Sequence, residues 1–355
     1  MQVLKSTITE IKAPDKAKYK EALKRLSLQA RPAGSLGVLE NISARLASIA
    51  GTLDVKLKNK VIVVCAGDHG IVEEGVSLFP QEVTSQMVFN FVKGGASINV
   101  LARHAGAKVL VADFGVNYDF ARSLMIFDKK VRKATSNFTK GPAMTREEAV
   151  RSVEGGISIV EELLMKGRID LLGTGDMGIG NTTPSSAVIA VLSGVSVEEV
   201  TGRGTGLDDK ALQNKIKVIK NGIKINKPNK KDALDVLRKV GGFEIGGLAG
   251  LLLGAAAHKI PVVCDGLIST AGALIACELA PLAKEYLFTS HRSVEAGHKY
   301  MHGHLGLEPL LDLKLRLGEG TGAALAMELL DAATRVLAEI KTFSEVNIAD
   351  VQRHS

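Results

Sequence analysis

Val61-Ile-Val-Val-Cys65, followed by Ala66-Gly67-Asp68-His69-Gly70, is the stretch that decides the fold. Its first half is continuously apolar, which is typical of a parallel strand buried on both faces. Its second half is small and polar, so we expect the strand to end there. Ligands of open α/β sheets bind just beyond the carboxyl ends of the strands. Asp68 and His69 are therefore candidate ligand-binding residues, or Asp68 instead caps the turn that follows.

Outward from this strand, apolar runs and helical patterns alternate along the chain. Four more strands are expected at residues 108–113, 169–172, 260–264 and 285–289. Helices are expected at 81–104, after the capping boxes that begin at Thr145 and Ser196, and from Asp208 onward. Residues 117–143 are polar and predict a long loop. Such alternation predicts an α/β fold with a doubly wound, mostly parallel sheet flanked by helices.

Residues 1–50 contain helical patterns without a strand, at 16–28 and from the turn after Pro32 to about Ala50. This part of the chain is expected to form a helical appendage. The longest uncharged run, Met177 to Val197, contains Gly, Asn, Thr, Pro and Ser, so it predicts no membrane span. The N-terminus lacks the apolar segment of a secretory signal. We therefore expect a cytoplasmic protein.

Composition narrows the classes of ligand. The net charge of +7 fits anionic small molecules as well as nucleic acid. Aromatic residues make up only 4% of the chain and Trp is absent, which argues against stacking platforms for single strands. Seven lysines lie within residues 214–231, but the apolar spacing there is that of a helix with one solvated face. No nucleic-acid partner is expected.

The cysteines and histidines do not predict a metal site. Cys65, Cys264 and Cys277 lie far apart between apolar residues, which indicates buried free thiols in a reducing compartment. His302 and His304 could bind a metal together, but a solvated or locally bonded pair is the simpler expectation.

Gly318-Glu319-Gly320-Thr321-Gly322 places one carboxylate among three glycines. Glycine lets the backbone turn tightly and lets a ligand approach closely. The residues that follow are strong helix formers, and Thr321 is expected to be the N-cap of that helix. Glu319 would lie just before the helix. It is either a general base or a carboxylate that interacts with the helix dipole.

Two upstream glycine-rich stretches predict phosphate binding. The first, residues 173–183, matches both a dinucleotide fingerprint and a Walker A pattern, with Asn181 where the second needs lysine. The second covers residues 201–206. Backbone N–H groups of such turns at helix N-termini bind phosphate. Lys215 and Arg316 are the cations expected to assist, so the residues alone predict a phosphorylated ligand and a carboxylate base.

Together these motifs resemble the nicotinate-nucleotide–dimethylbenzimidazole phosphoribosyltransferase family over nearly the whole chain. The resemblance rests on Arg31-Pro-Ala-Gly-Ser-Leu-Gly37, Gly67-Asp-His-Gly70, Pro80-Gln-Glu-Val-Thr84, Gly175-Asp-Met-Gly-Ile-Gly-Asn-Thr-Thr183, Thr201-Gly-Arg-Gly-Thr-Gly206, Asp265-Gly266, Ser290-His-Arg-Ser293 and Arg316-Leu-Gly-Glu-Gly-Thr-Gly322. It implies transfer of phosphoribose from nicotinate mononucleotide to a benzimidazole, without a cofactor or metal. It also implies a homodimer.

The resemblance assigns roles to individual residues. Glu319 matches the family's catalytic base, and Asp176 stands where a family pattern has glutamate, as a carboxylate that assists near the base or ribose. Arg31 stands where lysine is common. The substrate-binding positions that we expect are Phe79, Gln86, Asp68, His69, Gly175, Gly178, Gly180, Asn181, Thr182, Gly202, Arg203, Gly204, Lys215, Asp265, Gly266, Ser293 and Arg316.

The family fold implies a small helical domain built from the chain ends. We expect residues 1–55 to form part of it, residues 56–330 to form the α/β catalytic domain, and residues 331–355 to form a C-terminal helix that joins it. Two other functions stay open: an oxidoreductase that uses a nicotinamide dinucleotide, based on the 173–178 pattern, and a non-catalytic protein that binds a phosphorylated ligand. The accepting base is also open among benzimidazoles, purines and phenols.

Overall fold

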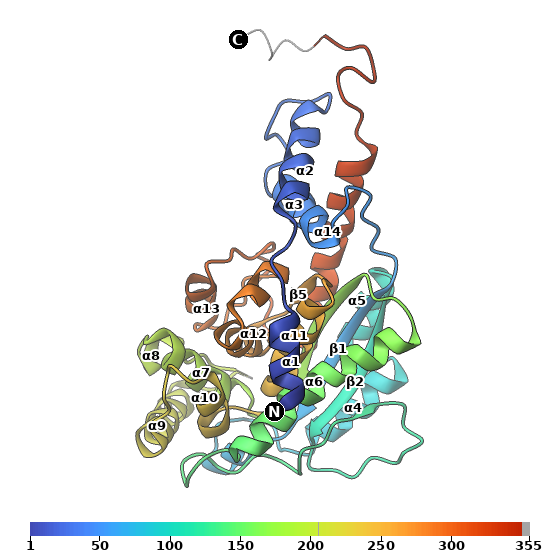
Figure 1. Ribbon diagram of the computed structural model, residues 1–355. Helices are drawn as coiled ribbons and strands as arrows, with labels where there is room; N and C mark the ends of the chain where they lie inside the picture. Colours follow the sequence, from blue (N-terminus) through green and yellow to red (C-terminus); the bar gives the residue numbers. More distant parts are fainter. Residues whose placement is uncertain (205, 350–355) are drawn as a thin grey trace.

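The computed structural model describes residues 1–204 and 206–349, and its centre is a six-stranded sheet in which every strand pair is parallel (Figure 1). The strand order is β3-β2-β1-β4-β5-β6. The strands are β1 (Lys60–Gly67), β2 (Ala107–Gly115), β3 (Phe127–Asp128), β4 (Leu171–Met177), β5 (Val262–Cys264) and β6 (Leu287–Thr289). The doubly wound α/β class predicted from the sequence is confirmed.

Helices cover both faces of the sheet, and several shorter helices lie in the connections between the main elements. The helices are α1 (Gln2–Glu10), α2 (Lys16–Leu28), α3 (Val38–Ala50), α4 (Val83–Lys93), α5 (Ser97–His104), α6 (Arg146–Lys166), α7 (Thr182–Ser193), α8 (Val197–Val200), α9 (Asp209–Asn226), α10 (Ala233–Val240), α11 (Phe243–Ala257), α12 (Leu267–Leu279), α13 (His298–Leu305) and α14 (Thr321–Glu339), with 3₁₀ turns at Gly70–Glu74 and Pro281–Tyr286. In the described residues, no helix is long and apolar enough to cross a membrane.

One face of the sheet carries α6 and α11, and the other carries α4, α5 and α14. Glycines let α6 and α11 pack closely, because a methyl group on Gly156 would lie 2.1 Å from the backbone oxygen of Gly247. The capping box of α6 forms as predicted: Glu148 N donates to the Thr145 hydroxyl at 3.1 Å, and Thr145 N donates to the Glu148 carboxylate at 2.8 Å.

The chain ends come together away from the sheet. Figure 1 shows α2 and α3 beside the distal half of α14, above the α/β body, with α1 lower down. Helix α14 packs on α3, while α1 packs on α6 and α11. The expected boundary between residues 330 and 331 falls inside α14, and residues 350–355 of the expected C-terminal segment lie outside the described residues.

The structure corrects three local expectations. The helix expected at 81–104 breaks at Gly94, whose φ of +78° ends α4, and α5 begins anew at Ser97. The strand expected to end at Leu172 continues to Met177, so Gly173 and Gly175 lie in β4 rather than in a loop. Two residues of the expected 117–143 loop form the edge strand β3.

Candidate active site

A cavity of about 570 Å³ lies beyond the carboxyl ends of the strands. Its walls come from the turns after β4, β5 and β6, the segment before α14, and the segment that leads into α4. Lining it are Val76, Ser77, Phe79, Val83, Met87, Asp176, Met177, Gly178, Ile179, Gly180, Asn181, Thr182, Gly204, Gly266, Leu267, Ile268, His291, Ser293, Glu295, Lys314, Leu315, Arg316, Leu317, Gly318 and Glu319. The cavity therefore combines one largely apolar wall with three carboxyls, those of Asp176, Glu295 and Glu319, and a glycine-rich turn.

Glu319 is held in this wall with 6% of its surface exposed. Its φ of +63° is left-handed, which costs a non-glycine residue about 1–2 kcal/mol. Its Oε2 accepts the backbone N–H of Ile98, in the first turn of α5, at 3.3 Å. Burial raises the pKa of the Glu319 carboxyl, the Ile98 N–H lowers it, and the charge of Asp265 raises it. Glu319 thus accepts a backbone N–H from the N-terminal turn of α5.

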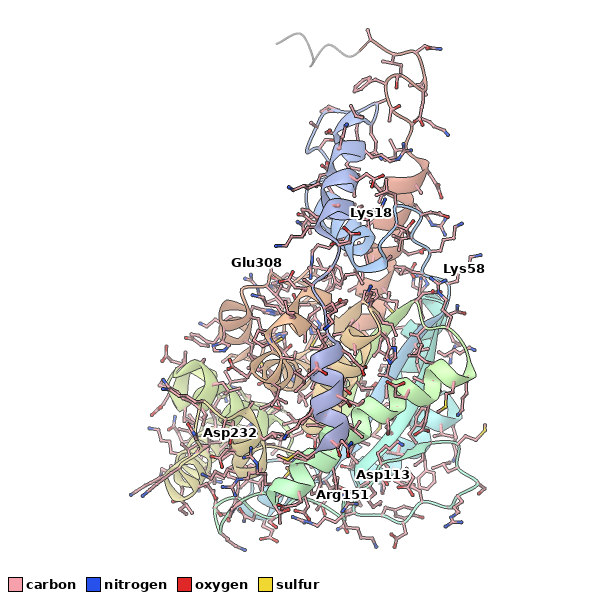
Figure 2. All side chains as sticks on the ribbon, in the orientation of Figure 1. Lys18, Lys58, Asp113, Arg151, Asp232 and Glu308 are labelled. Carbon is pink, nitrogen blue, oxygen red and sulfur yellow. The ribbon has the colours of Figure 1, made fainter. Side chains whose placement is uncertain are left out.

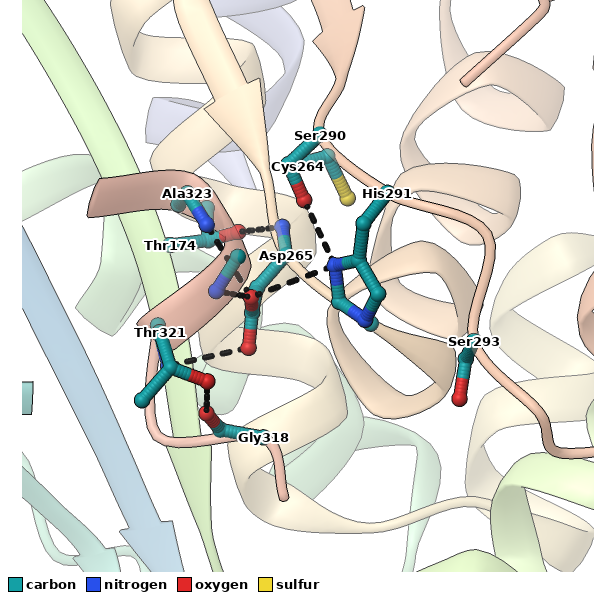
Figure 3. A network of polar contacts seen from close by, with 12 residues as sticks. Thr174, Cys264, Asp265, Ser290, His291, Ser293, Gly318, Thr321 and Ala323 are labelled. Atoms are coloured by element: carbon teal, nitrogen blue, oxygen red, sulfur yellow. Dashed lines mark hydrogen bonds and ion pairs between the residues drawn. The ribbon is translucent and has the colours of Figure 1, made fainter. Parts of the chain in front are cut away.

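The N-terminal turn of α14 is capped from elsewhere in the chain. Asp265 accepts the backbone N–H groups of Gly320, Gly322 and Ala323 at 2.9, 2.8 and 3.1 Å (Figure 3). Gly320 occupies the N-cap position, so the prediction that Thr321 is the N-cap is wrong. The Thr321 hydroxyl instead donates to the backbone oxygen of Gly318 at 2.8 Å. Asp265 itself is fully buried behind the cavity wall.

Asp176, near the end of β4, is the second carboxyl of the cavity. The side-chain amide of Asn181 donates to its Oδ2 at 2.9 Å, and no hydrogen-bond partner is found for its buried Oδ1 among the described residues. A methyl group on Gly318 would lie 3.0 Å from that Oδ1. Burial raises the pKa of Asp176 well above its usual range, and Asp265 adds to the shift. The raised pKa favours the protonated form of Asp176, whose O–H would be a hydrogen-bond donor.

Lys215, a residue of α9, is completely buried and lies at the centre of a candidate anion site. Its Nζ donates to the Thr182 hydroxyl at 2.8 Å and to the backbone oxygen of Gly202 at 3.3 Å. A methyl group on Gly204 would lie 3.4 Å from this Nζ, so glycine keeps the space beside it open. An ammonium has three N–H donors, and these oxygens match two of them within the described residues. Thr182 also begins α7, whose N-terminus favours an anion.

The other predicted residues divide between the cavity and its surroundings. Phe79, half exposed, and Arg316 line it, as do Gly266 and Ser293. Arg203 turns away: it donates to the backbone oxygen of Leu207 at 2.7 Å and pairs with Asp209. Gln86 is exposed on α4, whose inner side presents Val83 and Met87 to the cavity.

Asp68 and His69 are buried and are not among the residues that line the cavity. The Oδ2 of Asp68 accepts the backbone N–H of Asn117, 49 residues away, at 2.8 Å, so Asp68 does not cap the turn that follows it. His69 Nε2 lies 2.9 Å from the Glu244 carboxylate, and both side chains are buried. Burial lowers the pKa of His69, but Glu244 outweighs it and the net direction is upward.

Another strand-end carboxylate, Asp113, labelled in Figure 2, is also used structurally. It accepts the backbone N–H groups of Gly115 and Val116 at 3.0 and 2.8 Å and pairs with Lys130 at 3.0 Å. These bonds hold the turn after β2. A carboxylate at a strand end is therefore a weak indicator of catalysis in this chain.

Sequence reasoning missed His298, because no local pattern marks it, and His302, expected to be solvated or locally bonded, is buried. His298 is buried, accepts the backbone N–H of Ser293 at 2.9 Å, and contacts the Thr270 hydroxyl at 2.9 Å. His302 packs on it with ring centroids 4.3 Å apart, while His304 contacts Glu278. Burial lowers the pKa of His291 and of His302 to about 4 in each case. No group that could hold a metal occurs in the described part of the chain.

Comparisons with known proteins identify the family of this chain. The family model described as "Phosphoribosyltransferase" matches residues 11–348. The chain belongs to this phosphoribosyltransferase family. It is 57% identical over 349 residues to the nicotinate-nucleotide–dimethylbenzimidazole phosphoribosyltransferase of Citrifermentans bemidjiense, covering 98% of this chain and 99% of the relative. It is 53% identical over 350 residues to the Geobacter sulfurreducens protein of the same name, covering 99% of each.

A solved structure agrees with this assignment. The crystal structure of nicotinate-nucleotide–dimethylbenzimidazole phosphoribosyltransferase from Thermus thermophilus superposes with a TM-score of 0.90 at 41% identity, covering 95% of this chain and 99% of that one. The glycine pattern at 173–178 is consistent with this family and does not indicate a dinucleotide-binding protein. Its first two glycines lie inside β4 instead of forming a strand-to-helix turn, so the pattern is not a dinucleotide loop.

Proposed function

We propose that this phosphoribosyltransferase transfers phosphoribose from nicotinate mononucleotide to 5,6-dimethylbenzimidazole or a related base, giving α-ribazole 5′-phosphate and nicotinate. One observation carries the proposal: a buried carboxylate, Glu319, and an anion site at Thr182 and Gly204 face one cavity. The names of its relatives supply the substrates.

In the proposed reaction, one ring nitrogen of the base attacks the anomeric carbon of the ribose. The bond from that carbon to the pyridinium nitrogen breaks, and its electron pair returns to the ring as neutral pyridine. The other nitrogen of the base gives its proton to Glu319. Burial raises the pKa of Glu319 toward the operating pH, which makes a carboxylate a better proton acceptor. Attack from the face opposite the leaving group converts the β-nucleotide into the α-product.

The phosphate of the nucleotide is proposed to bind at the N-terminus of α7, between Thr182 and Gly204. The third N–H of the Lys215 ammonium would donate to it in a charge-assisted hydrogen bond. Because Lys215 is buried and its donors are fixed by Thr182 and Gly202, the phosphate would lock the ribose in one orientation.

Asp176 is proposed to act as a neutral hydrogen-bond donor rather than as a second base. Burial raises its pKa, which favours the protonated carboxyl group, and Asn181 fixes the orientation of that group. A donor here could hold a ribose hydroxyl or a ring nitrogen while Glu319 takes the proton.

The test is to incubate the purified protein with nicotinate mononucleotide and, in parallel, with 5,6-dimethylbenzimidazole, a purine and a phenol. Release of nicotinate together with a ribosylated base supports the proposal, and the panel ranks the acceptors. Ligand binding without product under all conditions would favour the non-catalytic alternative. A nicotinamide dinucleotide retained through purification would revive the oxidoreductase alternative.

We also propose a homodimer in the cytoplasm, with α2, α3 and the distal half of α14 as a small helical domain. Apolar side chains exposed on α4, α5 and the segment before β3 support self-association, among them Val92, Val100, Tyr118 and Met125. Three free thiols fit a reducing compartment. Light scattering of the purified chain tests the dimer, because a mass of one chain at micromolar concentration would contradict it.

A further inference from the structure

Asp265 accepts hydrogen bonds from three backbone N–H groups of a single turn. It follows β5 directly, is fully buried, and uses both carboxylate oxygens on α14. Its Oδ2 accepts from Gly320, while its Oδ1 accepts from Gly322 and Ala323 (Figure 3). These donors belong to the N-cap, second and third positions of the helix. Asp265 thus supplies the side-chain cap that Gly320 cannot supply.

The turn that Asp265 holds has an unfavourable backbone. Gly318, Glu319 and Gly320 are consecutive residues with positive φ, at +82°, +63° and +97°. Only glycine adopts this region freely, so Glu319 needs surrounding structure to keep it there. On one side of Glu319 that support is the three-N–H clamp of Asp265. On the other it is the single N–H of Ile98 on the carboxylate itself.

The clamp fits closely against its surroundings. A methyl group on Gly322 would lie 2.0 Å from Nδ1 of His291, and one on Gly320 would lie 2.8 Å from Ile62. The backbone N–H of Asp265 donates to the Thr174 hydroxyl of β4 at 3.2 Å, which fixes Asp265 in turn. The turn before α14 therefore has little freedom to relax if the carboxylate is altered.

The charge of Asp265 also acts on the cavity. His291 is the only cationic candidate within 4 Å of it among the described residues, at 3.8 Å. Burial lowers the pKa of that imidazole to about 4, so it is neutral near pH 7. Burial raises the pKa of Asp265 to about 6, although the N–H groups of α14 lower it. The negative charge above that pH therefore raises the pKa of Glu319 and of Asp176.

We propose that Asp265 is a positioning residue for the base Glu319: its carboxylate clamps the first turn of α14 and holds Glu319 in its left-handed conformation. This rests on the proposed function for the identity of the reaction. The clamp itself does not, because it is a property of the backbone around Gly320.

The first experiment compares wild type with Asp265→Asn. An asparagine oxygen can still accept from Gly322 and Ala323, but its amide would face the Gly320 N–H, donor against donor. We expect kcat to fall about 100-fold while KM for nicotinate mononucleotide stays within about threefold. Since the negative charge is removed, the pKa of Glu319 falls, and the acid limb of the kcat/KM profile moves to lower pH.

Asp170→Asn is the matched control. Asp170 is also buried and also accepts backbone N–H groups, in its case those of Lys58 and Asn59 at 3.1 and 2.8 Å, but it lies at the opposite end of β4. We expect it to lower the melting temperature without moving kcat or the acid limb. If Asp265→Asn behaves like this control, or if its acid limb moves to higher pH, Asp265 does not position the base.

Hydrogen exchange of the wild-type chain tests the clamp without a variant or an activity. The amides of Gly320, Gly322 and Ala323 should exchange slowly, within the same class as the interior of α14. Exchange as fast as that of an exposed loop would overturn the proposal even if Asp265→Asn fails to fold. Absent turnover in wild type with slow exchange at these amides would instead reject the proposed function and leave the clamp intact.

Discussion

Gly175 and Glu319 meet so closely that a methyl group on Gly175 would lie 2.3 Å from the backbone oxygen of Glu319. Gly175 belongs to β4 at the centre of the sheet, whereas Glu319 precedes α14, so the contact joins a central strand to the proposed base. A second glycine of the same strand, Gly173, leaves room for Met327 of α14 in the same way. The glycines of β4 thus set how near α14 can approach.

Gly175→Ala should displace the Glu319 turn. A contact of 2.3 Å to backbone cannot be relieved by a side-chain rotation, so the turn or β4 must move. A misplacement of this kind can cost about 100-fold in turnover, and we expect a loss of that order. The control is Gly303→Ala in α13, where nothing lies within 4 Å and alanine is favoured by about 0.5–1 kcal/mol. Wild-type turnover in Gly175→Ala would show that the close contact is not needed.

Glu319→Gln should fold normally and lose about 10²–10⁴-fold in turnover, the range of general-base catalysis. The amide oxygen can still accept the Ile98 N–H, so we expect little change in melting temperature. Glu328→Gln, at a partly exposed position on the following helix α14, serves as the control. A carboxylate that only interacts with a helix dipole would give the opposite result, near-normal turnover with a stability loss of about 0.3–1 kcal/mol. Single-turnover rates and melting curves of one preparation distinguish the two.

Lys215→Met should weaken the binding of nicotinate mononucleotide by about 1.5–3 kcal/mol, the worth of a hydrogen bond to a charged group. Methionine keeps the apolar stem but cannot donate, and affinity for the accepting base should not change. Lys217→Met, on the exposed side of the same helix, is the control. Calorimetry that finds equal nucleotide affinity in both variants would remove Lys215 from the site.

Nucleotide affinity should also depend on pH through Lys215. Burial lowers the pKa of its ammonium to about 8, so the charge is lost as pH rises through that value. Affinity should then fall by about tenfold between pH 8 and 9.5 in wild type and not in Lys215→Met. For the free protein the sign is reversed: the native chain binds fewer protons than the unfolded chain between about 8 and 10.5, so this group adds stability as pH rises through that window.

Asp176→Asn should leave turnover within about fivefold of wild type, far less than the loss of a general base. Asparagine resembles the protonated carboxyl, because its oxygen can accept from Asn181 while its amide donates into the cavity. Asp176→Ala removes both functions and should cost more. A loss in Asp176→Asn as large as that in Glu319→Gln would identify Asp176 as a base.

Features that depend on neighbouring residues in the sequence were predicted correctly, whereas features that depend on contacts between distant residues were missed. The apolar run 61–65 identified β1, and the capping box at Thr145 identified the start of α6. The break between α4 and α5 was missed, although Gly94-Gly95 signalled it. That break creates the helix N-terminus that donates to Glu319.

The roles of individual carboxylates were harder still. Asp68, Asp113, Asp176 and Asp265 all end or follow strands, yet three of them accept backbone N–H groups and one carries an orphaned oxygen into the cavity. The role of each carboxylate depends on distant hydrogen-bond partners: that of Asp68 lies 49 residues away, and that of Asp265 lies 55 residues away. No local sequence pattern encodes such a contact. The same holds for Gln86 and Met87, adjacent residues of which only Met87 faces the cavity.

Helix α14 runs unbroken from the Glu319 turn to the packing surface of α3. A 19-residue helix is about 28 Å long. Helix α14 therefore links the helices of the chain ends to the turn that carries the proposed base, so a rotation of α14 where it packs on α3 would move Glu319. Cross-linking α3 to α14 through engineered cysteines should then change turnover without touching the cavity.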